Sequence, residues 1–273
     1  MAEILDDAQK RKYGVGYFNG VNLEMIRAYI RAAEDLRSPI IIGTAEGLLQ
    51  YASFDWLAPL LINAAQKASV PVAVHLDHTF SFDVIMKALA AGFGSVMFDG
   101  SRLSYEENIK ISADIARIAH PMGVGLECEL GKVGGLDEGG SKGKNVYTDP
   151  AQAVDFMKRS NADFLAISIG TTHGVYTEPP CLQLDLLEKI RKLVPGALVL
   201  HGGSGLSDDD FRNCIAKGIS KINIYTDVIT AAINKTKEKC GTENYTDLNI
   251  KVEQAMYEVT AHKLKLFGSD NKF

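Results

Sequence analysis

Three histidines that lie far apart in the chain have the residue type for metal chemistry. His78, His173 and His201 each come at or just after the end of a short apolar run. Imidazole is a common metal ligand, and three imidazoles with an open fourth position are typical of a catalytic zinc site. Their separation excludes a local zinc-finger spacing, so the fold would have to bring them together. The alternative is that each is a separate buried or hydrogen-bonded histidine.

Carboxylates accompany these histidines at the ends of the runs. Asp77 directly precedes His78, and a carboxylate beside a metal can orient a ligand or transfer a proton. Asp99 and Glu129 end two later runs, where they would hold a second cation or support the ligands. Alternatively, Asp99 and Glu129 are structural and accept hydrogen bonds from the backbone or from basic neighbours. His75 lies three residues before His78, so strand alternation predicts that it faces the other way and is structural.

A glycine-rich segment, HGGSG at 201–205, offers unhindered backbone N–H groups and the hydroxyl of Ser204 just before an expected helix. Such a turn suits a phosphate, and the positive end of the helix dipole adds to the attraction. Glycine-rich turns are also ordinary turns. The phosphate interpretation gains from Asn223 and Thr226 on the next apolar run, because the last two loops of a parallel barrel commonly form a phosphate site.

The elements that must position these residues alternate regularly along the chain. Eight short, mostly apolar runs predict parallel strands buried on both faces, at residues 13–19, 39–45, 71–77, 95–100, 123–130, 164–170, 197–202 and 221–227. Amphipathic stretches between them predict helices, which start after Asn22, Ser81, Asp149 and Ser207 and end with one over about 246–266. Eight strand–helix units predict an α/β protein, a (β/α)8 TIM barrel with its chemistry at the carboxyl ends of the strands. An open doubly wound sheet is the alternative, and the lack of an early GxGxxG disfavours it.

Length, composition and charge fit one globular domain. The chain has 273 residues, 46% of them hydrophobic, so we expect residues 1–273 to form a single barrel with a C-terminal helical extension. The glycine-rich stretch at about 131–148 is expected to be a long mobile loop. The formal net charge of −5 disfavours nucleic acid as a partner.

The cysteines and the N-terminal segment indicate the compartment. The four cysteines form no CxxC pair, so we expect reduced thiols. We find neither a signal-peptide pattern nor an apolar run long enough to cross a bilayer. A cytoplasmic protein without a membrane partner is therefore expected.

Taken together and in this order, the motifs resemble the class II, zinc-dependent ketose-phosphate aldolases of the fructose-bisphosphate and tagatose-bisphosphate type. The matching segments are HLDH at 75–78, ECELGKVGG at 127–135, TTHGVY at 171–176, LHGGSG at 200–205 and KINIYTD at 221–227. The resemblance covers nearly the whole chain. It implies a (β/α)8 barrel that reversibly cleaves a ketose 1-phosphate or 1,6-bisphosphate into dihydroxyacetone phosphate and an aldehyde through an enediolate.

The resemblance also implies residue roles. His78, His173 and His201 would bind Zn²⁺, and Asp77 would be the acid/base that acts on the C4 hydroxyl. Asp99 and Glu129 match positions that take up a second zinc. The substrate and its C1 phosphate would be bound by Asn19, Gly174, Gly202, Gly203, Ser204, Asn223, Tyr225 and Thr226. A monovalent cation, Na⁺ or K⁺, would lie near the phosphate loops, and the chain would form a homodimer or homotetramer.

A second acid/base must protonate the enediolate to release dihydroxyacetone phosphate. In the resembled family this is a loop glutamate soon after the Gly-Gly pair that ends the fifth run. The matching positions lead us to expect Asp137 in this role, with Glu138 as the reserve. The loop that carries them would close over the substrate and exclude water.

Three departures from the family's pattern bear on the substrate. Ala45 stands in place of a serine or threonine, and Tyr225 stands in place of the aspartate of fructose-bisphosphate enzymes. Asn244-Tyr245-Thr246 aligns with the family's Asp-Pro-Arg, whose arginine holds the distal phosphate. Losing that guanidinium removes charge-assisted hydrogen bonds of about 1.5–3 kcal/mol. We therefore expect a substrate without a C6 phosphate, and a bisphosphate-specific fructose or tagatose aldolase is the alternative.

Three other functions compete with this one. A metal-dependent hydrolase on the same barrel often carries a paired HxH on its first strand, where this chain reads GYFNG. A Schiff-base aldolase needs a desolvated lysine on a strand. The sixth run has none, and Lys221 opens the eighth run rather than ending it. A non-catalytic sugar-phosphate binder would keep HGGSG but has no use for three converging histidines.

Overall fold

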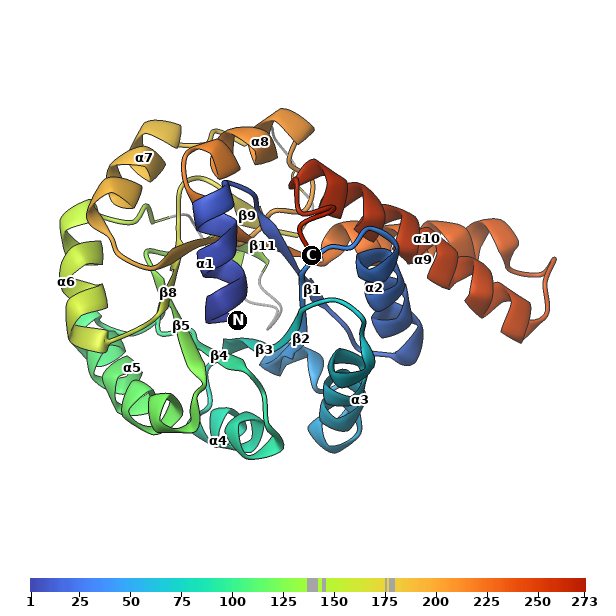
Figure 1. Cartoon of the computed structure of the whole chain (residues 1–273), viewed down its shortest axis with the longest axis horizontal. Helices are drawn as coiled ribbons and strands as arrows, with labels where there is room; N and C mark the ends of the chain where they lie inside the picture. The colour runs from blue at the N-terminus through green and yellow to red at the C-terminus, as the bar shows by residue number, and fades with distance from the viewer. Residues whose placement is uncertain (137–141, 144–145, 175, 177–179) are drawn as a thin grey trace.

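The eight expected strands form a closed parallel barrel in the computed structural model, which describes residues 1–136, 142–143, 146–174, 176 and 180–273 (Figure 1). Each strand pairs with the next along the chain, and β1 pairs with β11, which closes the sheet. The strands are β1 (Val15–Asn19), β2 (Ile40–Ala45), β3 (Val72–Thr79), β4 (Ser95–Phe98), β5 (Gly125–Leu130), β8 (Phe164–Ile167), β10 (Ala197–Leu200) and β11 (Ile219–Ile224). The (β/α)8 prediction is confirmed, and the open sheet is excluded.

Helices surround the barrel and connect its strands (Figure 1). They are α1 (Ala2–Arg11), α2 (Leu23–Asp35), α3 (Phe54–Lys67), α4 (Phe82–Ala91), α5 (Tyr105–Ala119), α6 (Pro150–Ser160), α7 (Leu184–Leu193), α8 (Asp208–Ala216), α9 (Thr226–Lys239) and α10 (Tyr245–Leu266). Two 3₁₀ turns, η1 (Glu46–Leu48) and η2 (His120–Met122), follow β2 and α5.

The helices begin at the residues that the sequence predicts. The side chains of Asn22, Asp149 and Ser207 each accept a hydrogen bond from a backbone N–H in the first turn of α2, α6 and α8. These bonds satisfy N–H groups that have no partner within the helix. Ser81 occupies the N-cap position of α4 but makes no capping bond, because its hydroxyl donates to Glu46 instead.

Three features differ from the sequence prediction. Helix α1 was not expected, and its Leu5 and Ala8 pack against the apolar residues inside the barrel. The stretch expected to be an irregular loop contains β6 (Gly134–Leu136) and β7 (Lys142–Gly143), which form a small sheet with β9 (Thr172–His173). The sequence did not predict β6 and β7 because short strands in a glycine-rich segment show no alternation of apolar and polar residues. The last barrel strand stops at Ile224, so Thr226 begins α9 rather than lying on the strand.

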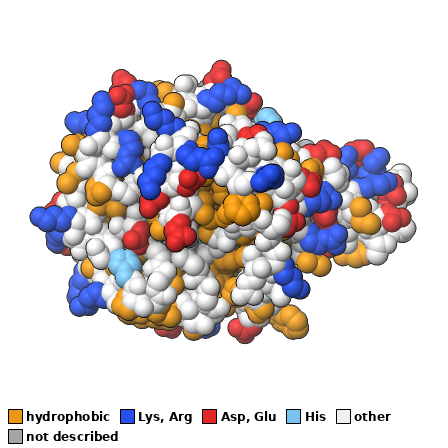
Figure 2. Space-filling view, viewed as in Figure 1, with side chains coloured by type: hydrophobic (Ala, Val, Ile, Leu, Met, Phe, Trp, Pro, Cys, Tyr) orange, Lys and Arg blue, Asp and Glu red, His pale blue; other side chains and the backbone are white. Residues whose placement is uncertain are grey.

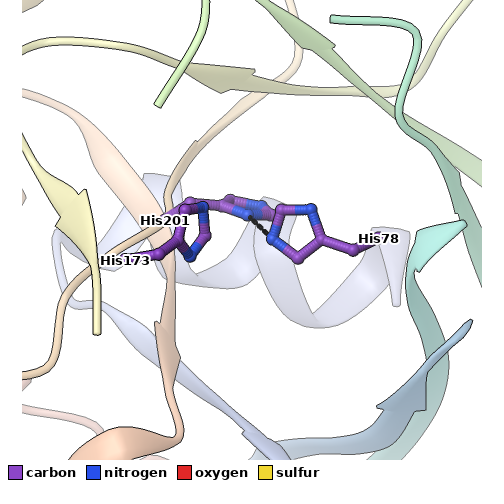
Figure 3. A group of neighbouring side chains, drawn as sticks. All are labelled: His78, His173 and His201. Atoms are coloured by element: carbon purple, nitrogen blue, oxygen red, sulfur yellow. Dashed lines mark hydrogen bonds between the residues drawn. The ribbon is translucent and has the colours of Figure 1, made fainter. Parts of the chain in front are cut away.

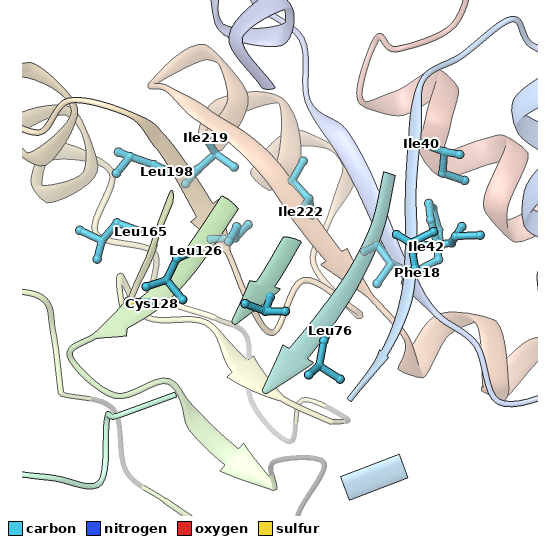
Figure 4. Close-up of a cluster of buried hydrophobic side chains, with 14 of the residues drawn as sticks. Phe18, Ile40, Ile42, Leu76, Leu126, Cys128, Leu165, Leu198, Ile219 and Ile222 are labelled. Carbon is cyan, nitrogen blue, oxygen red and sulfur yellow. The ribbon is translucent and has the colours of Figure 1, made fainter. Parts of the chain in front are cut away.

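Strand alternation divides the core into two layers and decides which side chains reach the site. Leu76, Leu126 and Cys128 point outward into the cluster between strands and helices (Figure 4). Their chain neighbours Asp77 and Glu127 therefore point into the barrel, where both are fully buried. The outward apolar residues thus pack against the helices, whereas the inward positions carry a second apolar cluster together with the polar side chains of the site.

The C-terminal helices α9 and α10 pack against each other and extend beyond the barrel (Figure 1). On the face drawn in Figure 2, basic and acidic side chains are interspersed rather than gathered into one field. Among the described residues, none of the helices has the length and apolarity needed to cross a bilayer.

Candidate metal centre and phosphate cradle

The three histidines that the sequence singles out converge at the carboxyl ends of the strands. The Nε2 atom of His78 lies 2.7 Å from Nδ1 of His201, and one ring nitrogen of each histidine lies within 4.8 Å of the others. The ring centroid of His173 is 4.9 Å from that of His78 and 6.0 Å from that of His201. Figure 3 shows the rings directed toward one another from separate parts of the barrel.

Local backbone geometry brings each ring to this point. His78 has a φ of 36°, and the pairing of β3 with β4 shifts register between Leu76 and Thr79. A left-handed conformation at a non-glycine residue costs on the order of 1 kcal/mol or more and is characteristic of functional sites. His173 lies on β9, where it pairs with Gly135 of β6. His201 directly follows β10.

The same irregularity corrects the expectation for His75. Simple alternation predicts that His75 faces away from His78, but the register shift lets both side chains lie inside the barrel. The Nε2 atom of His75 lies 3.7 Å from Oδ1 of Asp77 and 3.6 Å from Oε2 of Glu127. Its Nδ1 lies 2.8 Å from the hydroxyl of Ser95. His75 is therefore part of the buried network below the histidine cluster, not of the cluster itself.

The protonation pattern of the rings fits a bound cation. His78 Nδ1 lies 3.1 Å from Oδ2 of Asp99, and His201 Nε2 lies 2.9 Å from Oε1 of Glu127. Because ionised carboxylates only accept, these outer nitrogens carry the protons. The inner nitrogens, His78 Nε2 and His201 Nδ1, then face each other at hydrogen-bond distance, 2.7 Å apart. Two ring nitrogens this close share either a proton or a metal ion, and three converging imidazoles are a donor set that zinc takes.

Burial also favours neutral imidazoles at His173 and His201. Desolvation and the neighbouring ring of His78 lower the pKa of His201, and the same causes together with His201 lower the pKa of His173 well below its usual value. Neutral rings are the form that binds a metal. The residue types, their convergence and the low pKa values of His173 and His201 are thus consistent with a metal site.

Asp77 lies beside the histidine cluster and is held in its ionised form. Its carboxylate accepts hydrogen bonds from the amide of Asn223 at 3.0 and 3.1 Å and from the amide of Asn19 at 3.4 Å. Burial alone would raise the pKa of Asp77, but the neighbouring rings of His78 and His75 hold it well below the ordinary value. Asn223 and Asn19 are here partners of Asp77, so their expected contact with substrate stays a prediction.

The buried carboxyl groups of Asp99 and Glu129 lie close to His78. The three form a group whose ligand atoms lie within 4.8 Å of one another. Burial would raise the pKa of Asp99, but hydrogen bonds from His78 and Ser101 lower it to about 2. For Glu129, burial and the charge of Asp99 raise the pKa to about 8. Oε2 of Glu129 is buried and has no hydrogen-bond partner among the described residues, which is the kind of group that a second cation would satisfy.

Two residues of the centre were missed by the sequence reasoning. Glu127 and Lys221 are fully buried inside the barrel, and their side chains pair at 2.8 Å next to His201. A signal was available for both. Glu127 stands two residues before Glu129 on the same strand, so the two share a face, and Lys221 is a charged residue that opens an apolar run.

The HGGSG segment and the start of α9 form the predicted cradle. The hydroxyl of Ser204 accepts hydrogen bonds from the backbone N–H groups of Tyr225 and Asp227 at 3.2 and 3.3 Å, so this loop lies against the helix N-terminus. Gly202 has a φ of 64°, and a Cβ there would lie 2.6 Å from the carbonyl oxygen of Thr172. The loop therefore needs glycine to pack this closely.

A cavity of about 730 Å³ opens at this cradle. Gly174, Ser204 and Thr226 line it together with residues of α9 and α10, including Lys263. Thr226 reaches the cavity from the first turn of α9, and Gly203 lies against the backbone of β11. The three histidines do not line this cavity, but Gly174 directly follows His173, so the cradle and the metal centre are adjacent. Asp137 and Glu138, the expected second acid/base, lie outside the described residues.

The comparisons with known proteins agree with this geometry. Residues 1–272 match the family model described as fructose-bisphosphate aldolase class-II. The chain is 40% identical to the protein YdjI of Escherichia coli K12 over 269 residues, which cover 98% of this chain and 96% of YdjI. It is 38% identical to the sulfofructosephosphate aldolase of Alkalicoccus urumqiensis over 276 residues, covering 98% of this chain and 96% of that protein.

A solved structure supports the same relationship. The crystal structure of the Escherichia coli YdjI aldolase superposes with a TM-score of 0.91 at 38% identity and covers 99% of this chain and 97% of that one. The agreement thus extends over sequence, barrel and length. The chain belongs to the class II fructose-bisphosphate aldolase family, whose members are lyases that depend on zinc.

Proposed function

We propose that this protein is a zinc-dependent aldolase that reversibly cleaves a ketose 1-phosphate into dihydroxyacetone phosphate and an aldehyde. The observation that carries the proposal is the convergence of His78, His173 and His201, each of which has a ring nitrogen within 4.8 Å of the others. An ionised carboxylate, Asp77, and a glycine-rich anion cradle lie next to these rings. A Lewis acid, a base and a phosphate site are the three parts that this cleavage requires.

Each part has a place in the reaction. Zn²⁺ bound by His78, His173 and His201 would supply a Lewis acid that stabilises negative charge on the ketone oxygen of the substrate. Asp77, ionised at neutral pH, accepts the proton of the C4 hydroxyl as the C3–C4 bond breaks. Backbone N–H groups of the cradle and the hydroxyl of Ser204 bind the C1 phosphate, which fixes C3 and C4 near Asp77.

The remaining assignments complete the proposal. Asp137, with Glu138 in reserve, returns a proton to the three-carbon product before it leaves. Asp99 and Glu129 hold a second divalent cation beside His78, and Na⁺ or K⁺ binds near the phosphate loops. The chain acts in the cytoplasm as a homodimer or homotetramer, which light scattering checks as a mass about two or four times the 29.7 kDa of one chain.

The distal end of the substrate carries no phosphate. Ala45 is fully buried and pairs in register with Asp77, so it places a methyl group where the resembled family has a serine or threonine hydroxyl. Asn244 caps the start of α10 through its side chain, and the neighbouring Tyr245 is 77% exposed. Neither position supplies the cation that a second phosphate dianion needs.

A substrate comparison tests this proposal. With zinc-loaded enzyme, we expect kcat/KM for a ketose 1-phosphate to exceed that for fructose 1,6-bisphosphate by roughly 10- to 100-fold, which corresponds to the missing hydrogen bonds to a charged group. Condensation of dihydroxyacetone phosphate with a panel of aldehydes identifies the second product. The family name and the relatives called fructose-bisphosphate aldolase favour the bisphosphate as the alternative, and a strong preference for it would overturn the distal-end proposal.

A further inference from the structure

A buried ion pair lies directly beside the histidine cluster. The Nζ atom of Lys221 lies 2.8 Å from Oε2 and 3.1 Å from Oε1 of Glu127, and neither side chain is exposed. Oε1 of Glu127 also lies 2.9 Å from Nε2 of His201. Lys221, Glu127 and His201 thus form a continuous chain of contacts that ends at the Nδ1 atom facing His78.

Stability alone does not account for this buried pair. Moving two charges into a protein interior costs several kcal/mol per ion, and apolar residues of similar volume are often at least as stable. Neighbouring positions inside the barrel are apolar, including Met97, Ala166 and Val199. A lysine and a glutamate at this depth therefore call for a reason other than packing.

The contacts provide that reason. A carboxylate that accepts from Nε2 fixes the proton of His201 on this nitrogen and leaves a lone pair on Nδ1. It also fixes the rotation of the ring about its bond to Cβ. Lys221 contacts both oxygens of Glu127 and lies 4.6 Å above the ring of Tyr17, so the carboxylate itself has little freedom to turn.

We propose that Glu127 and Lys221 form a positioning pair for the metal centre, in which Glu127 orients His201 and Lys221 holds Glu127. In this role both residues act through His201. The inference rests on the zinc site of the proposed function, but it concerns how tightly that site binds an ion rather than which sugar is cleaved. Groups that hydrogen-bond to a ligand histidine typically change metal affinity by 10- to 100-fold when they are lost.

The test is a double-mutant cycle read out as zinc affinity. Apoproteins of wild type, E127Q, K221M and E127Q/K221M are titrated with zinc in competition with a chelator of known affinity. E253Q is the matched control, because Glu253 is also a buried glutamate in an ion pair, 3.2 Å from Arg27, but lies on α10 outside the barrel. Thermal unfolding of each apoprotein separates lost stability from lost affinity.

We expect E127Q to bind zinc 10- to 100-fold more weakly, and E253Q to stay within about twofold of wild type. Because Lys221 acts through Glu127, K221M changes zinc affinity in the wild-type background but not in the E127Q background. If E127Q does not fold, E127D keeps the charge beside Lys221 while withdrawing it from His201, and we expect the same weakening.

Two results would overturn the inference. Zinc affinity of E127Q, or of E127D in its place, within twofold of wild type removes the role of Glu127. An effect of K221M that is the same in both backgrounds, including no effect in either, removes the role of Lys221. Both readouts are independent of turnover, so a wrong choice of substrate in the proposed function leaves them unchanged.

Discussion

At the scale of single residues, Asp77 is the group that accepts the C4 hydroxyl proton in the proposed reaction. Its carboxylate is buried yet ionised, because His78 and His75 lower its pKa and the amides of Asn223 and Asn19 donate to it. We expect D77N to lower kcat for cleavage by about 10²–10⁴-fold, since it removes the proton acceptor and leaves the three histidines in place. Steady-state kinetics with zinc-saturated enzyme measures the loss.

The control for D77N is D163N at the other end of the barrel. Asp163 lies just before β8 and accepts hydrogen bonds from the backbone of Leu126 at 2.7 Å and from His120 at 3.0 Å. Its loss affects stability but no group at the metal centre, so kcat is expected to change little. An equal fall in kcat for both variants would mean that Asp77 has no special role in proton transfer.

At the scale of elements, the approach of β2 to β3 depends on one glycine. A Cβ on Gly43 would lie 1.8 Å from the carbonyl oxygen of His75, which is backbone and has no room to move. We expect G43A to cost about 3 kcal/mol of unfolding free energy, the upper range for overpacking. Chemical denaturation measures this cost.

G94A is the matched variant, because a Cβ there would meet nothing nearer than the oxygen of Val74 at 3.8 Å. Its unfolding free energy is expected to stay within about 0.5 kcal/mol of wild type. Equal stability of G43A and G94A would contradict the close approach of β2 to β3 at Gly43.

The elements also show what the sequence can and cannot predict. The strands and the starts of α2, α6 and α8 follow from apolar runs and capping residues, which are local signals. The convergence of His78, His173 and His201 was inferred from the barrel, because parallel strands all end at one face. The bulge at His78, which lets His78 lie inside the barrel together with His75, has no local signature, and neither has the pairing of β6 with β9 in a glycine-rich stretch. Glu127 and Lys221 became visible as a pair only when the barrel closed.

At the scale of the whole molecule, the distribution of the four cysteines reports on the fold. Cys128 and Cys214 are buried, and burial raises the pKa of each thiol to about 12, whereas Cys181 and Cys240 are exposed. Because the thiolate is the reactive form, we expect two thiols to react with a thiol reagent at pH 8 in the native protein and four after denaturation. Rapid reaction of three or four thiols in the native state would contradict the packing of β5 and α8.

The central claim is that His78, His173 and His201 together hold the ion on which turnover depends. The most direct measurement is zinc affinity alongside aldol cleavage for wild type and for H78A, H173A and H201A, each after complete chelation and after zinc is restored. We expect chelated wild type to be inactive and to recover with zinc, and each variant to lose its tightest-bound zinc and its turnover together. Full turnover of the chelated wild type, or variants that keep the tightly bound zinc, would contradict the claim.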